Sequence, residues 1–179
     1  MNLLNPLKIE EAPEGSKANL QALHKSLGFV PNLMATFANS PAVLEGYMAM
    51  DKAFEKSSLK PVDRQLVLLA ASVENNCEYC KAAHSTILAS LKVDKKIIKA
   101  VRSRTSTGDS KKDALVDVVR ELVSERGAIS EATQKRFFGQ GYTSVQLMEI
   151  LLGIALKTVS NYLDHFNPTE LDSVFKAAV

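Results

Sequence analysis

Along most of the chain, apolar residues recur three and four positions apart, which is the spacing of one face of an α-helix. Segments rich in Val, Ile and Thr that alternate apolar and polar residues are missing, and so are Asn-Gly and Asp-Gly hairpin turns. The pattern therefore predicts an all-α protein. A length of 179 residues fits one domain, residues 1–179, with a sizeable core.

Proline, glycine and capping residues divide this pattern into helices. Residues 1–16 contain Pro6 and Pro13 and are expected to form an extended arm, and Gly28 begins a turn that continues to residue 32. Thr143 and Gln146 fit a capping box that opens a long apolar helix. The predicted helices cover approximately residues 17–26, 41–56, 62–74, 77–91, 94–103, 111–126, 131–139, 144–163 and 169–177.

Two parts of the chain resemble each other. Shifting residues 63–84 by 81 positions places them on residues 144–165, where Gln65 falls on Gln146 and His84 on His165. Either a helix pair was duplicated and its second copy lost the cysteines, or two amphipathic segments match by chance.

Composition narrows the function classes. Hydrophobic residues make up 46% and the formal net charge is +2, with scattered basic residues, so neither a nucleic acid nor a membrane surface is expected as a partner. The first residues lack the pattern of a signal peptide, and no apolar run approaches the ~20 residues that span a bilayer. We expect a cytoplasmic protein.

The candidate chemistry lies in one short stretch that holds the only two cysteines, Cys77 and Cys80, and the histidine His84. On a helix the three side chains fall within about 60° of one another, and His84 is four residues after Cys80, the spacing at which helical side chains meet. An imidazole there can take a proton from the Cys80 thiol, directly or through one water.

The expected position at a helix start adds a second effect. With Asn76 as the N-cap, residues 77–80 occupy the first turn, where unpaired N–H groups and the helix dipole favour a thiolate. Thiols of this kind titrate at roughly 3.5–7.5 instead of ~8.5. Two such thiols can form a disulfide by exchange or through a sulfenic acid made by peroxide, and both routes need an external dithiol or protein disulfide reductant.

Two other interpretations compete with a redox dithiol. Cys77, Cys80 and His84 supply three zinc ligands where a structural site needs four, and the remaining imidazoles are His24 and His165. No metal and no cofactor is therefore expected. The simplest alternative is two buried cysteines beside a histidine that only packs.

At these residues the chain resembles a known family. Residues 62–84 are similar to the core of AhpD-like alkylhydroperoxidases of the carboxymuconolactone decarboxylase superfamily, and the likeness extends to residues 28–32, 40–41, 153–165 and 169–172. The resemblance implies an all-α AhpD-like fold, a homo-oligomer (a trimer or hexamer), and thiol-dependent reduction of hydroperoxides or disulfides. It also implies that Cys80 attacks, Cys77 resolves, and His84 accepts the proton.

One position departs from the family pattern. The family has a glutamate twelve residues before the first cysteine, where this chain has Gln65, which forms hydrogen bonds but carries no proton as a carboxylate does. Glu74, close to the first cysteine, is the candidate to replace it. The alternatives are a helical oligomeric redox sensor or scaffold without turnover, and a decarboxylase of the same superfamily, which does not rely on a dithiol.

Overall fold

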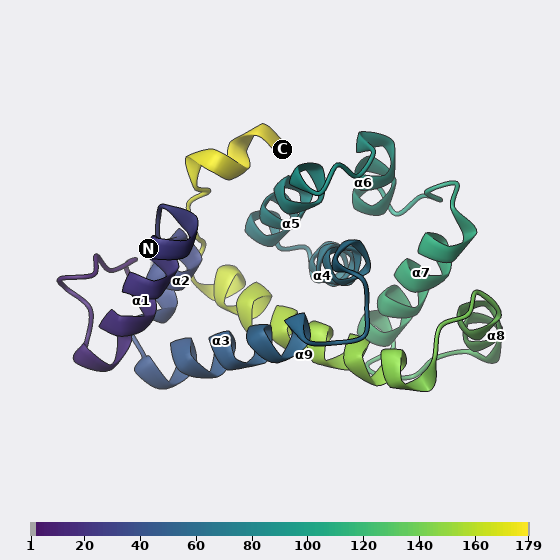
Figure 1. The fold of residues 1–179 in the computed structure, drawn as a ribbon, viewed down its shortest axis with the longest axis horizontal. Helices are drawn as coiled ribbons and strands as arrows, with labels where there is room; N and C mark the ends of the chain where they lie inside the picture. The colour runs from purple at the N-terminus through teal and green to yellow at the C-terminus, as the bar shows by residue number, and fades with distance from the viewer. Residues whose placement is uncertain (1–2, 179) are drawn as a thin grey trace.

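A computed structural model describes residues 3–178, and the regular structure in these residues is entirely helical (Figure 1). The prediction of an all-α protein is confirmed. The helices are α1 (Glu14–Leu27), α2 (Asn32–Phe37), α3 (Pro41–Glu55), α4 (Pro61–Glu74), α5 (Glu78–Ser90), α6 (Lys95–Arg102), α7 (Ser110–Ser124), α8 (Glu131–Gly139), α9 (Ser144–Phe166) and the 3-10 helix η1 (Ser173–Ala178).

Most boundaries match the predicted ones within a few residues, and two differences matter. Helix α2 was not predicted, because its six residues are too few to show a helical period; the predicted turn ends at Pro31, the residue before it. The N-terminal arm ends at Pro13, three residues earlier than expected, and residues 1–2 lie outside the described part of the chain.

Helix α4 forms the centre of the fold. Every residue from Leu66 to Val73 is buried, and such a helix, apolar on all sides, needs neighbours all round. It packs against α5, α6, α7 and α9, and Figure 1 shows it almost end-on between them. The short connection from α4 to α5 buries Cys77, whereas Asn75 is half-buried and Asn76 is exposed.

Helix α9 crosses the molecule and passes close to α3 and α4. A Cβ atom at Gly153 would lie 2.7 Å from Cζ of Phe54 and 3.0 Å from Cγ1 of Val67, so only glycine allows this approach. The predicted capping box of Thr143 and Gln146 opens the helix. Residues 144–165 form one unbroken helix, whereas residues 63–84 are interrupted after Glu74, so the two segments do not share the helix-pair structure that a duplication predicts.

The C-terminal segment folds back onto α5, where η1 packs. The Tyr79 hydroxyl donates to Oδ2 of Asp172 at 2.5 Å, and the backbone N–H of Asn32 donates to the same carboxylate at 3.2 Å. The Phe175 ring meets the Tyr79 ring edge to face, with centroids 5.8 Å apart. The segment is therefore tied to Tyr79, one of the two residues between the cysteines.

Within residues 3–178 no single helix is long and apolar enough to cross a membrane. Helices α8 and α9 reach that length and apolarity only as a pair, and they are bent by 113° relative to each other.

Candidate functional site

The first cysteine begins helix α5. Asn76 adopts a left-handed conformation with φ of 55°, and Cys77, not Asn76 as predicted, is the N-cap. The Sγ atom of Cys77 accepts a hydrogen bond from the backbone N–H of Cys80 at 3.3 Å. The left-handed turn at Asn76 moves the helix start one residue along the chain. Cys80 therefore lies in the first turn, while Cys77 lies just before it.

The two thiols are free, buried and differently ionised. A hydrogen bond from Cys77 lowers the pKa of Cys80 to about 6, against the effect of burial, and the positive charge of Lys157 and a contact with Ser160 add to the shift. The same hydrogen bond and burial raise the pKa of Cys77, whose Sγ also lies 3.2 Å from Oδ2 of Asp164. Cys80 is the thiolate at neutral pH, and Cys77 keeps its proton.

His84 is held between two polar side chains. Its Nδ1 lies 2.9 Å from Oε1 of Gln65, and its Nε2 lies 2.9 Å from Nζ of Lys157. A lysine ammonium only donates hydrogen bonds, so Nε2 is the acceptor, and Nδ1–H donates to Gln65. Burial and the charge of Lys157 lower the pKa of His84 well below its usual value, which keeps the ring neutral.

This arrangement has no direct bond between His84 and Cys80, which is one of the two proton routes that the sequence predicts. Among the described residues, neither ring nitrogen of His84 bonds to a sulfur atom, because Lys157 reaches in from α9 and takes Nε2. The Lys157 side chain is 2% exposed and also donates to the Tyr47 hydroxyl at 3.4 Å. Burial alone would lower the pKa of Lys157, but the charge of Cys80 and the neighbouring Tyr47 outweigh it and raise that pKa overall.

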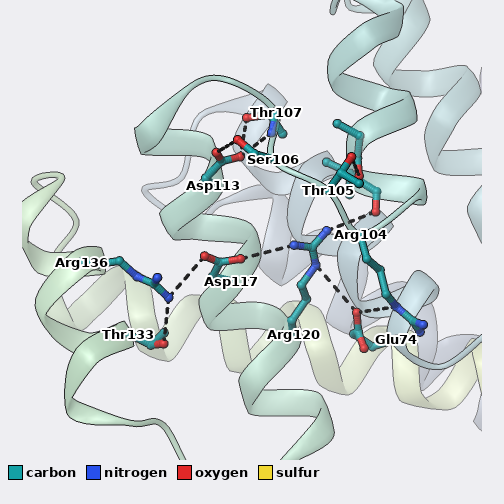
Figure 2. A network of polar contacts seen from close by, with 12 residues as sticks. Glu74, Arg104, Thr105, Ser106, Thr107, Asp113, Asp117, Arg120, Thr133 and Arg136 are labelled. Carbon is teal, nitrogen blue, oxygen red and sulfur yellow. Dashed lines mark hydrogen bonds and ion pairs between the residues drawn. The ribbon is translucent and has the colours of Figure 1, made fainter.

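Glu74 has other partners than the thiols. Its carboxylate accepts from Nε of Arg104 at 3.1 Å and lies 3.8 Å from Nε of Arg120 (Figure 2). Arg120 in turn pairs with Asp117, so Glu74 belongs to a network between α4 and α7. In the described part of the chain no hydrogen bond or ion pair joins Glu74 to Cys77, Cys80 or His84, and the structure does not support Glu74 as a substitute for the family carboxylate.

A pocket of about 900 Å³ reaches the second cysteine. Its lining includes Cys80, His84, Lys157 and Tyr47, while Cys77 does not line it. The apolar part of the lining includes Leu27, Met34, Met48, Leu68, Ile87 and Phe175. Cys80 is therefore the thiol that faces the pocket.

Residues 3–178 contain no group of three or more His, Cys, Asp or Glu side chains arranged to hold a metal ion. His24 and His165, the other two imidazoles, are exposed, and His165 stacks on the ring of Tyr162. Both nitrogens of His84 already have hydrogen-bond partners.

Comparisons with known proteins show a family match for the central part of the chain and a similar fold for most of it. Residues 41–121, which contain the dithiol, match the model of the Carboxymuconolactone decarboxylase family. The fold resembles that of a peroxidase-related protein with an alkylhydroperoxidase AhpD core from Ralstonia eutropha JMP134, with a TM-score of 0.85 and 20% identity over 95% of this chain and 92% of that chain. The family match of this central segment and the AhpD-like fold together support a place for the chain in the carboxymuconolactone decarboxylase superfamily.

Two further structures show the same fold. A peroxidase-related protein from Silicibacter sp. TM1040 has a TM-score of 0.82 and 18% identity over 97% of this chain and 94% of that chain. The debrominase Bmp8, in a cysteine-to-alanine variant bound to 2,3,4-tribromopyrrole, has a TM-score of 0.83 and 17% identity over 99% of this chain and 96% of that chain. None of the curated proteins compared with the chain matches it.

Sequence reasoning missed the α9 side of the site, which supplies Lys157, Ser160 and Asp164. These residues lie outside the segment that matches the family model. Their spacing was a usable signal, since positions 150, 153, 157, 160 and 164 lie on one helical face with Ile150 and Gly153. A lysine on the apolar face of a core helix is rarely buried without a partner.

Proposed function

We propose that the protein is a dithiol peroxidase or disulfide reductase in which Cys80 attacks the substrate and Cys77 resolves the product. One observation carries the proposal: the thiol that lines the pocket is also the one whose pKa is lowered to about 6. Its neighbour has a raised pKa and does not line the pocket, as suits a thiol that acts second. Because the reaction consumes a dithiol reductant, a cytoplasmic location fits it.

The proposed reaction balances as a two-electron oxidation of the dithiol. The Cys80 thiolate attacks the outer oxygen of a hydroperoxide, the O–O bond breaks, and an alkoxide leaves and takes up a proton. The thiol of Cys77 then attacks the sulfenic acid, which forms the Cys77–Cys80 disulfide and releases water. An external dithiol reduces the disulfide by exchange and restores both thiols.

The test is turnover with an alkyl hydroperoxide and dithiothreitol. The wild-type protein should consume many equivalents of peroxide, and Cys80→Ser should consume none. In the absence of dithiothreitol, Cys77→Ser should react once and accumulate a Cys80 sulfenic acid, which dimedone traps for mass spectrometry. A wild-type protein that consumes a single equivalent would be a redox sensor instead, and an active Cys80→Ser variant would contradict the assignment of the attacking thiol.

Bmp8, a debrominase by name, suggests a second substrate class for the same dithiol. An apolar pocket that ends in a thiolate and an ammonium suits a halogenated aromatic ring. The thiolate would take the bromine, the ring carbon would take a proton, and Cys77 would then displace bromide to form the disulfide. The same assay with 2,3,4-tribromopyrrole in place of peroxide measures bromide release. Faster turnover with this compound than with hydroperoxides would favour the second class.

We also propose that the chain self-associates through an exposed stripe of α9. The α9 stripe alternates steps of three and four residues, carries no charge, and consists of Val145, Met148, Leu152, Ala155, Val159, Tyr162 and Phe166. This is the spacing of a helix–helix seam. If a second copy runs antiparallel across a twofold axis near Ala155, the large Phe166 faces Val145, and Leu152 faces Val159.

A twofold contact of this kind fits the predicted hexamer but not an isolated trimer, because a trimer contains only threefold contacts. In sedimentation velocity, Met148→Glu combined with Tyr162→Glu should reduce the assembly to smaller species. Ala18→Glu, which adds a charge at an exposed position of α1, should leave the assembly unchanged. A wild-type monomer, or an assembly that tolerates both stripe charges, would contradict the proposed contact.

A further inference from the structure

We propose that the Lys157 ammonium, and not the imidazole of His84, is the group that holds Cys80 as a thiolate and gives its proton to the leaving oxygen. The proposal rests on the dithiol function above and identifies the acid of that same site. His84 and Gln65 are then positioning residues that hold the lysine in place.

The geometry supports this assignment. Lys157 and Cys80 both line the pocket, and the lysine nitrogen is fixed by Nε2 of His84 at 2.9 Å and by the Tyr47 hydroxyl at 3.4 Å. Because Nε2 accepts from the lysine, the neutral imidazole has no free nitrogen for the Cys80 proton. The ammonium has three N–H donors, and two of them are used. The third is available for sulfur or for a substrate oxygen in the pocket.

The charge balance of the site points the same way. None of the ion pairs in the described part of the chain includes Lys157. A buried ammonium without a counter-charge is strongly unfavourable. The Cys80 thiolate supplies that charge, and its attraction to Lys157 appears in the shifted pKa values of both groups. With Gln65 where the family has a glutamate, the carboxylate beside the two thiols is Asp164, which contacts Cys77 and forms no ion pair with Lys157.

Other titratable groups also face the lysine. Helix α3 contributes Tyr47 and Asp51, and the N-cap of α5 contributes Cys77. Helix α5 itself contributes Cys80 and His84. Asp51 is the one carboxylate among them. Burial and Glu55 raise its pKa, and it makes no ion pair with Lys157, so it competes weakly with the thiolate as the partner.

The proton balance closes within the site. In the reduced state the pair is a thiolate and an ammonium. When Cys80 attacks the peroxide, the alkoxide that leaves takes a proton from Lys157 and departs as an alcohol, so the lysine becomes neutral as the thiolate charge disappears. Cys77 then forms the disulfide and water is released. After reduction of the disulfide, the Cys80 thiol returns its proton to the Lys157 amine, and the charged pair forms again.

The test separates two roles of Lys157: stabilising the Cys80 thiolate by its charge, and donating a proton to the leaving oxygen. Iodoacetamide alkylates a thiolate and releases iodide, which needs no proton, whereas peroxide reduction needs one. The rate of Cys80 alkylation, followed by mass spectrometry across pH, should show an inflection near 6 in the wild type. In Lys157→Met the inflection should move up by about one pH unit or more. In Lys157→Arg it should stay low, because the charge remains.

The rate of peroxide reduction then tests whether Lys157 is the proton donor. At a pH above both inflections, Lys157→Met should be alkylated at the wild-type rate but should reduce peroxide roughly tenfold or more slowly. Lys157→Arg should show the same defect with peroxide, because a guanidinium does not release its proton. Lys135→Met, which replaces an exposed lysine whose side chain is 81% accessible, is the matched control and should change neither rate.

Specific outcomes would overturn the proposal. An unshifted alkylation inflection in Lys157→Met would exclude the lysine as the counter-ion. Equal losses with iodoacetamide and peroxide at high pH would exclude it as the acid. If the wild type consumes no peroxide, the proposed function fails, but the alkylation inflection still decides the charge pair. Circular dichroism checks the fold of each variant, and Lys157→Arg keeps the test valid if Lys157→Met does not fold.

Discussion

The sulfur of Cys77 accepts a hydrogen bond from the backbone N–H of Cys80 at 3.3 Å, so the resolving thiol is also the N-cap of helix α5. The thiol of Cys77 in turn gives the largest contribution to the lowered pKa of Cys80. One side chain therefore supports both the start of the helix and the reactivity of its neighbour.

Replacing Cys77 should affect stability and thiol reactivity together. Cys77→Ala removes the cap and should lower the free energy of unfolding by about 1 kcal/mol. It should also raise the pKa of Cys80, because the hydrogen bond to the thiolate is lost. Cys77→Ser keeps an acceptor and a donor, so both effects should be smaller. Urea unfolding and the pH dependence of Cys80 alkylation measure them, and an alanine variant indistinguishable from the serine variant would contradict the capping role.

The ionisation of Cys80 predicts how stability depends on pH. Its pKa is about 6 in the folded protein against 9.0 for an ordinary thiol, so the unfolded chain binds more protons between these values. The free energy of unfolding of the reduced protein should therefore rise with pH from 6 to 9, by at most about 1.4 kcal/mol per unit, and this gain is lost as the pH falls through 6.

The control for this dependence is Cys80→Ser, whose stability should be nearly flat over the same window. The lowered pKa of His84 has the same sign, but it acts below 6.5, so measurements above pH 7 isolate the thiol. Parallel curves for the wild type and Cys80→Ser would show that Cys80 is not ionised in the folded protein.

Gln65 supports the tautomer of His84 that Lys157 requires, because its Oε1 accepts from Nδ1–H. Gln65→Leu removes the acceptor of Nδ1–H, so the ring can move its proton to Nε2, where it opposes Lys157. We expect peroxide turnover to fall several-fold, roughly the effect of one lost hydrogen bond of ~1 kcal/mol. The decisive readout is the pair of ¹⁵N ring shifts of His84, which report the tautomer directly.

Gln65→Glu is the informative companion to this variant. A carboxylate keeps the tautomer and should raise the pKa of His84, because a negative charge favours the protonated ring. The variant thereby restores the residue that the family pattern has at this position. Ring shifts that are unchanged in Gln65→Leu would mean that Gln65 does not control the tautomer.

How much of this could be read from the sequence depends on the distance between partners along the chain. The helices follow from local periodicity, and Cys77, Cys80 and His84 are within eight positions of one another, so their closeness was predictable. The cap at Cys77 depends on the left-handed turn of Asn76, which a pattern of apolar residues does not encode.

The other residues of the site, on helix α9, are distant in sequence from the two cysteines and His84. Lys157 reaches His84 from 73 positions away, because Gly153 lets α9 approach α3 and α4. Glu74 is close to Cys77 in sequence but turns to Arg104, 30 positions away, once α4 is packed. Closeness in sequence therefore predicted Glu74 as a site residue, whereas tertiary packing places Lys157 in the site.

The hydrogen bond between the Tyr79 hydroxyl and the Asp172 carboxylate should control access to the pocket. Asp172→Ala leaves the buried Tyr79 hydroxyl and the Asn32 N–H without their acceptor, at a cost of roughly 1–3 kcal/mol. The η1 segment should then detach and take Phe175 out of the pocket wall. Hydrogen exchange at residues 173–176 should become faster, and the KM for an apolar hydroperoxide should rise more than kcat falls.

Two further variants test whether this outcome depends on the hydrogen bond between Tyr79 and Asp172. Tyr79→Phe removes the hydroxyl but keeps the ring contact with Phe175, so it should cause a smaller change in the same direction. Glu170→Ala alters an exposed side chain of the same segment and should change neither exchange nor KM, because Glu170 bonds to Asn32 only through its backbone carbonyl. Unchanged hydrogen exchange in Asp172→Ala would show that the ring contacts alone hold η1 over α5. The hydrogen bond to Asp172 would then not control access to the dithiol.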